Sequence, residues 1–291
     1  MLLDRVSTSG LLDTTYLYDT RGRTTHVTTG DRTTEYVYDD TNPKVRGNVE
    51  SIIAADGQIT RFEYDELDRI EKTTYHDGHS TATTYDKNGN AETLLVPTQV
   101  THSFASNGVN KVETNTTPLN EVTRYRYDKD RRLQEIELPS GQLITNTYTS
   151  GQLRKTTTVE GDIDYTYING SQPETVTEGT ESLTYGYDGD LVTSIQYAGE
   201  INTSIVQGYD PNFWLNSLTY AGSTTALNYD NDGLLTGINS YTIARNSSHG
   251  LPESMSDGVS VQTRTYSTYG ENDTVQNHIN DKRSYDYTLS Y

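Results

Sequence analysis

A step of about 20 residues, marked each time by a Tyr-Asp pair, constrains this chain more than any other feature of its sequence. The stretch 185–199 shows the unit most completely, because Tyr185 and Tyr187 alternate, Asp188 leads into a Gly-containing turn, and a second alternating run follows. Side chains with a period of two share one face of a strand, and Gly supplies the positive φ of tight hairpin turns. The unit is therefore predicted to be strand, turn, strand, turn.

Nine Tyr-Asp pairs recur along the chain, and we expect them to be structural. They are Tyr18 and Asp19, Tyr38 and Asp39, Tyr64 and Asp65, Tyr85 and Asp86, Tyr127 and Asp128, Tyr187 and Asp188, Tyr209 and Asp210, Tyr229 and Asp230, and Tyr285 and Asp286. Three long gaps hold altered copies, at Phe104 with Gly108, Tyr148 with Gly151, Tyr167 with Gly170, Arg245 with Asn246 and Gly250, and Tyr269 with Gly270. The predicted structural turn glycines include Gly22, Gly89, Gly151, Gly189 and Gly233.

These copies predict a single array of about 14 units over residues 1–291, which begins and stops in mid-repeat. We therefore expect open strand edges at both ends, with self-association as salt screens the charge of −19. About 28 strands make a sheet that is too long to stay flat, and a ring closed from it would have an interior too wide for its side chains to fill. The predicted fold is all-β, with tandem antiparallel hairpins in a curved or spiral sheet around a hollow interior.

Composition narrows the possible functions. The 41 acidic and 22 basic residues disfavour nucleic-acid binding, because phosphate backbones are also negative. Hydrophobic content of 32% is low for one large core, yet the regular Tyr, Val, Ile and Thr content suits strands and not disorder. Cysteine is absent, so no disulfide stabilises the fold. Neither a long apolar run nor a signal peptide is visible, so we expect no direct membrane insertion.

The spacing after each Tyr-Asp pair resembles a known family. Gly22-Arg23 follows the first pair, and Gly233-Leu234 follows the pair at 229. This pattern resembles the YD repeat, also called the Rhs repeat, and the stretch 242–252 is most similar to its teneurin-like bacterial subset. The resemblance implies a β-shell of the kind that encloses cargo in Rhs and insecticidal toxins. The family's self-cleaving aspartate core would lie beyond residue 291.

Other candidate sites are weak. His76 and His79 lie on a predicted turn with no further ligand nearby, so a zinc site is disfavoured. The stretches 188–190 and 230–233 lack the remaining oxygens of a calcium loop. Asp210-Pro211 is interpreted as a turn and not as a protease site. No nucleophile elbow or phosphate loop is present, so we expect no enzyme activity, no catalytic residue, no metal and no cofactor.

The favoured function is a non-enzymatic shell segment of an Rhs-type toxin or a teneurin-like protein, whose partners are the rest of its shell and an enclosed toxin or C-terminal segment. The alternative is a cell-surface adhesion or carbohydrate-binding module, with sugars stacked on the tyrosines and glycans or surface proteins as partners. Five Asn-x-Ser/Thr sequons would matter only in a eukaryotic secretory pathway. A secreted or cell-surface location is implied by the resemblance alone.

Overall fold

The computed structural model describes residues 2–45, 47–279 and 283–288, and these residues contain strands and turns but no helix. The chain divides into two compact units. The first consists mainly of Asp13–Tyr148, with residues up to Val6 and Thr156–Glu160; the second consists mainly of Gly161 onward, with Ser7–Leu12 and Thr149–Lys155. The described residues therefore provide no helix that could cross a membrane.

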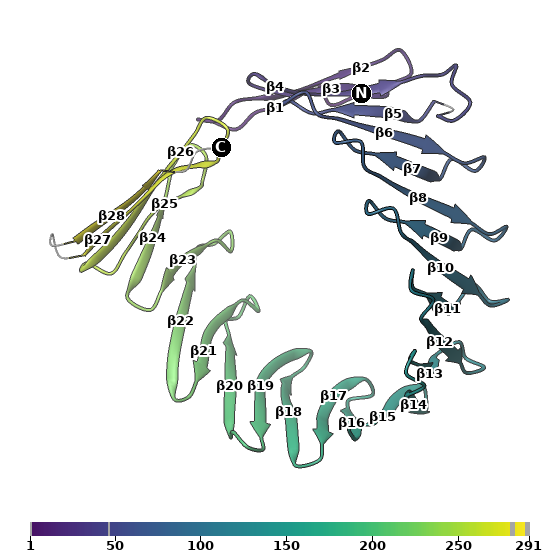
Figure 1. Ribbon diagram of the computed structural model, residues 1–291. Helices are drawn as coiled ribbons and strands as arrows, with labels where there is room; N and C mark the ends of the chain where they lie inside the picture. Colours follow the sequence, from purple (N-terminus) through teal and green to yellow (C-terminus); the bar gives the residue numbers. More distant parts are fainter. Residues whose placement is uncertain (1, 46, 280–282, 289–291) are drawn as a thin grey trace. The chain divides into compact units, whose positions relative to one another are not determined.

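The first unit contains fourteen of the described strands, and consecutive strands pair antiparallel throughout (Figure 1). They are β1 (Arg5–Val6), β2 (Thr14–Tyr18), β3 (Thr24–Thr29), β4 (Arg32–Tyr38), β5 (Val49–Ile53), β6 (Ile59–Tyr64), β7 (Ile70–Thr74), β8 (Ser80–Tyr85), β9 (Ala91–Leu95), β10 (Thr101–Ser106), β11 (Val112–Thr116), β12 (Val122–Tyr127), β13 (Leu133–Glu137) and β14 (Leu143–Thr149). Strand β15 (Gln152–Thr157) contributes residues to both units.

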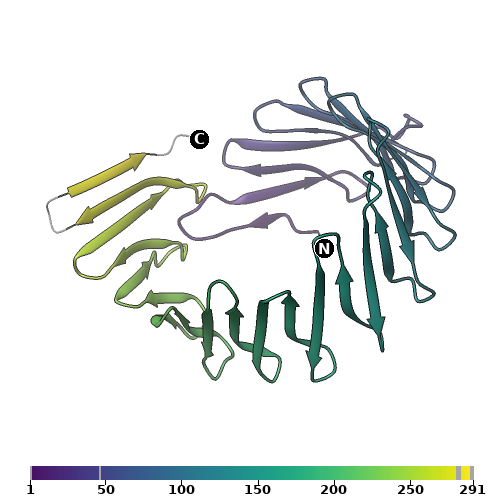
Figure 2. The ribbon, with the colours of Figure 1, turned by 60° about the horizontal axis from the view of Figure 1, so that its bottom comes forward.

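The second unit continues the same antiparallel pattern from β16 to β28, and Figure 2 shows its hairpins β16 to β21 side by side. Its strands are β16 (Asp162–Ile168), β17 (Gln172–Glu178), β18 (Glu181–Asp188), β19 (Leu191–Ala198), β20 (Thr203–Tyr209), β21 (Leu215–Tyr220), β22 (Ser223–Tyr229), β23 (Leu235–Ile238), β24 (Tyr241–Arg245), β25 (Pro252–Ser256), β26 (Ser260–Tyr266), β27 (Asn272–Ile279) and β28 (Arg283–Thr288). The prediction of an all-β fold of antiparallel hairpins is confirmed.

Each unit is a single layer. Within a unit, the described strands contact only their neighbours along the chain. Among the described residues, Val45 is the one hydrophobic side chain that is fully buried, at 1% exposure. It lies in the enlarged turn between β4 and β5, where Lys44 C=O accepts a 2.7 Å hydrogen bond from Tyr64 N–H. Stability therefore comes from contacts within the layer, since the strands that the structure describes form no second layer in either unit.

The two faces of the sheet differ in character. On one face, called here the tyrosine face, Tyr185 lies opposite Ile195, and Ile195 lies opposite Ile205. On the other, called here the threonine face, threonine hydroxyls pair across strands, as in Thr84 with Thr93 and Thr166 with Thr175, each at 2.7 Å. Strand β16 shows the contrast in burial, because its tyrosines are half-buried and the threonine between them is exposed. The alternation follows from the two-residue period of a strand.

Candidate functional site

The tyrosine of each repeat lies at a β-bulge. In β2 the register shifts between Leu17 and Tyr18, and in β4 it shifts between Val37 and Tyr38. The same shift precedes the corresponding residues Tyr64, Tyr85, Ser106, Tyr127, Tyr167, Tyr187, Tyr209, Tyr229, Arg245 and Tyr266. A bulge re-aims the side chain and increases local twist, so it sets the direction of each tyrosine.

In most repeats the tyrosine hydroxyl connects a hairpin to the preceding one. Tyr38 Oη donates to Thr24 C=O at 2.8 Å, and Thr24 is the residue that pairs with Tyr18. Equivalent bonds of 2.6 to 3.2 Å are made by Tyr64, Tyr85, Tyr127, Tyr148, Tyr187, Tyr209, Tyr229 and Tyr266, and Tyr18 donates to Leu3 C=O. Each such bond spans 14 to 17 residues, so the tyrosines form a ladder of unit-to-unit links.

The aspartate that follows the tyrosine organises the hairpin turn. Asp128 Oδ1 accepts hydrogen bonds from the backbone N–H groups of Asp130 and Arg132, at 2.9 and 3.0 Å. Its Oδ2 accepts from Arg132 Nε at 2.7 Å. The side-chain bond from Arg132 is the main cause that lowers the pKa of Asp128, and at Asp19 the main cause is the backbone N–H of Arg23. Hydrogen bonds to the charged form favour it, so these carboxylates are ionised at neutral pH.

An arginine links this turn to the tyrosine of the next repeat. The bulged tyrosine, the aspartate that follows it and this arginine are together called the node here. The Arg23 guanidinium lies 4.2 Å from the centre of the Tyr38 ring, and Arg69 lies 4.1 Å from that of Tyr85. Arg132 and Tyr148 repeat this stacking at 4.6 Å. The sequence contained a signal for this role, an arginine four residues after the aspartates at 19, 65 and 128, but the motif alone did not show what the arginine contacts. A cation over an aromatic ring is attracted by the ring quadrupole.

In the second unit Arg154 still stacks on Tyr167, at 5.1 Å, but at two later repeats other side chains take the arginine's place beside the next tyrosine. Trp214 packs against Tyr229 with ring centres 5.7 Å apart, and His249 packs edge-on against Tyr266 at the same distance. The aspartates at 210 and 230 still accept two backbone N–H bonds each within their turns. At Asp210 the turn is therefore kept, and Trp214 takes the position of the arginine over the neighbouring ring.

Three further motif aspartates differ from the common geometry. Asp188 pairs with Leu191 inside the ladder around a two-residue turn, so it does not occupy the turn position that Asp128 holds. Asp39 accepts bonds from the backbone of Thr41 and Asn42 in the enlarged turn. Asp86 bonds with Asn90 in place of an arginine. For Tyr285 and Asp286, the structure gives the β28 backbone, and their side chains lie outside the described residues.

Two altered copies lie a few residues from where the sequence suggested. The residues at the bulge and turn are Ser106 and Asn107, not Phe104 and Gly108, because the left-handed turn position falls on Asn110. Similarly, Tyr266 occupies the bulge and Ser267 opens the turn, whereas Tyr269 was expected to mark that copy. Aromatic or glycine identity alone misplaced both, since the bulge is defined by strand pairing.

The five predicted turn glycines all have positive φ, between 58° and 92°. The same turn position is taken by residues with a side chain elsewhere, including Asp68, Arg131 and Phe213 at φ of 61° to 65°. The predicted histidine turn is a local structure, since His79 Nδ1 lies 3.1 Å from Asp77 Oδ2. Within the described residues, no group of three His, Cys, Asp or Glu side chains could hold a metal ion.

Comparison with solved structures shows the same fold at low identity. The TcdB2-TccC3-Cdc42 crystal structure superposes with a TM-score of 0.65 and 14% identity, over 94% of this chain and 16% of that chain. TcdB2-TccC3 superposes with a TM-score of 0.58 and 11% identity, over 98% of this chain and 21% of that chain. The Photorhabdus luminescens Tc holotoxin pore superposes with a TM-score of 0.54 and 13% identity, over 96% of this chain and 20% of that chain. The chain thus spans about a fifth or less of these proteins. No curated protein matches it.

The teneurin YD-shell family matches residues 3–291, nearly the whole chain, and so includes every described tyrosine of the ladder. The bulged tyrosine, the turn-forming aspartate and the single-layer antiparallel sheet are what this match covers. The chain belongs to the teneurin YD-shell family.

Proposed function

We propose that this chain is a non-enzymatic wall segment of a β-shell that encloses a polypeptide. The observation that carries the proposal is the single-layer sheet with two unlike faces. The tyrosine face bears half-buried aromatic and aliphatic side chains, such as Tyr197 and Leu218, but the described residues of each unit form no second layer over it. Apolar surface of this extent on one face marks a surface that meets another polypeptide.

The node supports the mechanical part of this role. A wall around a cargo needs stiffness without a core, and the tyrosine ladder provides hydrogen bonds between hairpins, with a stacked arginine at some of them, as at Tyr38 and Tyr85. Such arrays gain stability from nearest-neighbour interfaces, which lets the wall extend unit by unit. The structural neighbours, which contain a TcdB2-TccC3 assembly, are consistent with a toxin-type shell and with a secreted or cell-surface parent.

Sugar stacking on the motif tyrosines is the less favoured alternative. Their hydroxyls already donate to backbone carbonyls, and several rings are covered by arginine, as with Tyr38 and Tyr85. A glycan array distinguishes the two functions, because an adhesion module would give reproducible binding that Tyr→Ala changes on exposed faces remove.

The direct test is protease protection of the enclosed polypeptide. The parent protein is purified, digested with a broad-specificity protease in native buffer and again in denaturant, and the surviving peptides are identified by mass spectrometry. A polypeptide outside the wall sequence that survives only in native buffer supports the shell. Rapid digestion of everything except the wall contradicts it.

A further inference from the structure

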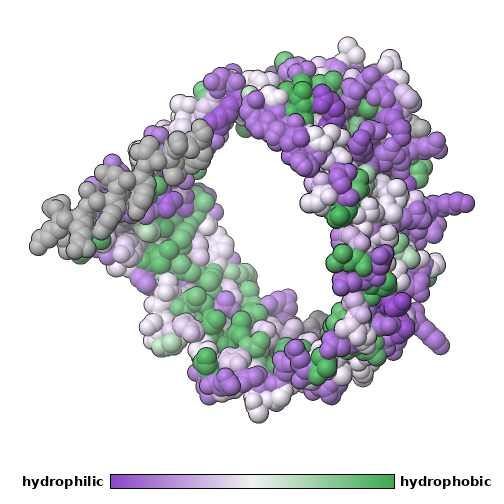
Figure 3. Space-filling view, in the orientation of Figure 1, coloured by the Kyte–Doolittle hydropathy of each residue, from purple (hydrophilic) through white to green (hydrophobic). Residues whose placement is uncertain are grey.

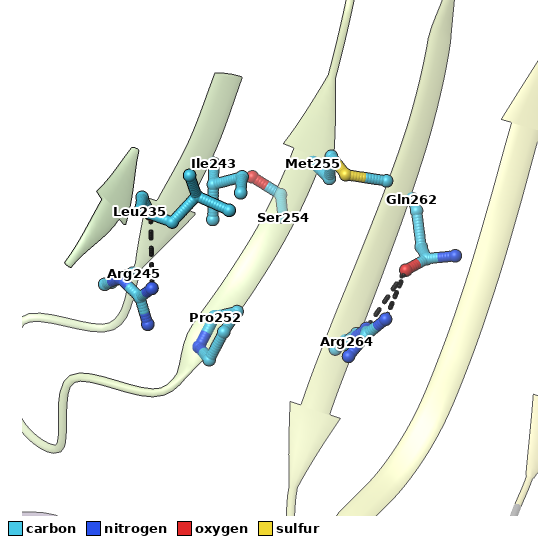
Figure 4. A pocket seen from close by; sticks show the side chains of 8 residues that line it. All are labelled: Leu235, Ile243, Arg245, Pro252, Ser254, Met255, Gln262 and Arg264. Carbon is cyan, nitrogen blue, oxygen red and sulfur yellow. Dashed lines mark hydrogen bonds between the residues drawn. The ribbon is translucent and has the colours of Figure 1, made fainter. Parts of the chain in front are cut away.

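A small pocket opens on the tyrosine face of the second unit, among strands β23 to β26 (Figure 4). Its volume is about 220 Å³, and its apolar wall is formed by Leu235, Ile243, Pro252 and Met255. Hydrophobic residues gather over this part of the unit in the space-filling view (Figure 3). Ligand pockets for whole small molecules usually measure about 300 to 1,000 Å³, so this one suits a single side chain.

Two arginines line the pocket beside this apolar wall. Figure 4 shows Pro252 between Arg245 on one side and Arg264 on the other. Arg245 occupies the bulge position that a tyrosine holds in other repeats, and its Nη2 donates to Leu235 C=O at 3.2 Å, as a tyrosine hydroxyl would. Its Nε–H is buried and donates to no group of the described residues. Within that same described part of the chain, Arg264 donates to the side chain of Gln262 alone, at 2.8 and 3.0 Å.

Neither guanidinium has a carboxylate partner among the described residues. Arg23, Arg69 and Arg132, by contrast, each pair with an aspartate. A half-buried guanidinium without an anion has lost part of its hydration and gained no ion pair, and arginine is well suited to bind carboxylates in a bidentate manner. Each guanidinium could therefore pair with a carboxylate from another molecule without displacing one from the described part of this chain.

We propose that this pocket binds an acidic–aliphatic segment of polypeptide, with an aliphatic side chain against Met255 and Ile243 and the neighbouring carboxylate on Arg245 and Arg264. Charge complementarity favours this occupant, because the cluster is cationic within a chain of net charge −19. The inference deepens the proposed function and rests on it, since the occupant is a segment of the enclosed polypeptide. It gives the wall a point of attachment for its cargo.

The sequence supplies a reporter for this pocket. The chain has two methionines, Met1 and Met255, so labelling with [¹³C-methyl]methionine gives a signal in the pocket wall that can be assigned by Met255→Leu. The probes are acetylated, amidated tetrapeptides of sequence Gly-Leu-Asp-Gly, Gly-Leu-Asn-Gly and Gly-Gly-Asp-Gly, together with inorganic phosphate. The variant is Arg264→Gln. Arg154→Gln is its control, because Arg154 also bonds a glutamine two residues earlier, at 2.7 Å, but does not line the pocket.

The Gly-Leu-Asp-Gly peptide should shift the Met255 signal in a saturable manner. Replacing its aspartate by asparagine, or Arg264 by glutamine, should weaken binding by about tenfold or more, because a charge-assisted pair is lost. Arg154→Gln should bind as the unmodified chain does, and omission of the leucine should also weaken binding. The proposal is overturned by equal binding of the Asp and Asn peptides, by unchanged binding to Arg264→Gln, by a shift with phosphate but no peptide, or by no shift at millimolar peptide. Protease protection of a cargo together with any of these results would support the proposed shell function and refute only the proposed binding at this pocket.

Discussion

Removing one hydroxyl from the tyrosine ladder should measure what a unit-to-unit link contributes. Tyr38→Phe removes the 2.8 Å bond to Thr24 C=O but keeps the ring 4.2 Å beneath Arg23. A neutral hydrogen bond contributes about 0.5 to 1.5 kcal/mol net, so we expect a loss of about 1 kcal/mol. Burial raises the pKa of Tyr38, so its hydroxyl remains a donor at neutral pH.

The effect should be local, because stability in such an array is a sum over units and their interfaces. Native-state hydrogen exchange is therefore the appropriate assay, since long arrays need not unfold in one cooperative step. A loss of about 1 kcal/mol corresponds to about fivefold faster exchange of the amides in β3 and β4. Amides in the second unit should exchange at unchanged rates.

Tyr36→Phe is the matched control. Tyr36 lies on the same face of the same strand, but no described residue bonds its hydroxyl. We expect this substitution to leave exchange in β3 and β4 within the error of the measurement. Equal effects of the two substitutions, or no effect of Tyr38→Phe, would refute the ladder as a source of stability and leave only the ring contacts.

Four further predictions concern the rest of the node. Asp128→Asn should reduce the loss of unfolding free energy between neutral and acid pH, measured by urea unfolding at a series of pH values. The lowered folded-state pKa makes the ionised Asp128 stabilising above about pH 5, and this contribution is lost as the pH falls through the ordinary value near 3.9 and then through the folded-state pKa. Arg132→Lys should lower the melting temperature more than Arg126→Lys, because Arg132 both hydrogen-bonds Asp128 and stacks on Tyr148, whereas Arg126 makes exposed ion pairs. Equal shifts in melting temperature would contradict this. Arg131→Gly should stabilise by about 0.5 kcal/mol, since a side chain at φ 64° is strained by about 1 to 2 kcal/mol and glycine loses about 0.5 to 1 kcal/mol of entropy; Gly89→Ala at φ 92° should destabilise by about 1 to 2 kcal/mol in the same denaturation assay.

The sequence by itself determined the repeat, the strands and most of the turns. These depend on local chemistry: the two-residue period of strands, and the positive φ that glycines such as Gly22 and Gly233 supply. Hairpin pairing joins neighbours along the chain, so a pattern of strands and turns already defines who pairs with whom. That is why the all-β antiparallel fold could be predicted from spacing alone.

The tertiary structure decided which atoms meet across the strands. A one-residue bulge places each tyrosine hydroxyl on a carbonyl 14 to 17 residues away, and no local pattern specifies that contact. Strand pairing also shows that the bulges of two altered copies lie at Ser106 and Tyr266. Asp188 pairs within the strand ladder, because its two-residue turn leaves no loop for the carboxylate to organise. The tertiary structure also showed Arg245 acting as a tyrosine substitute beside an apolar pocket, since a cavity exists only where side chains from several strands fail to fill the space between them.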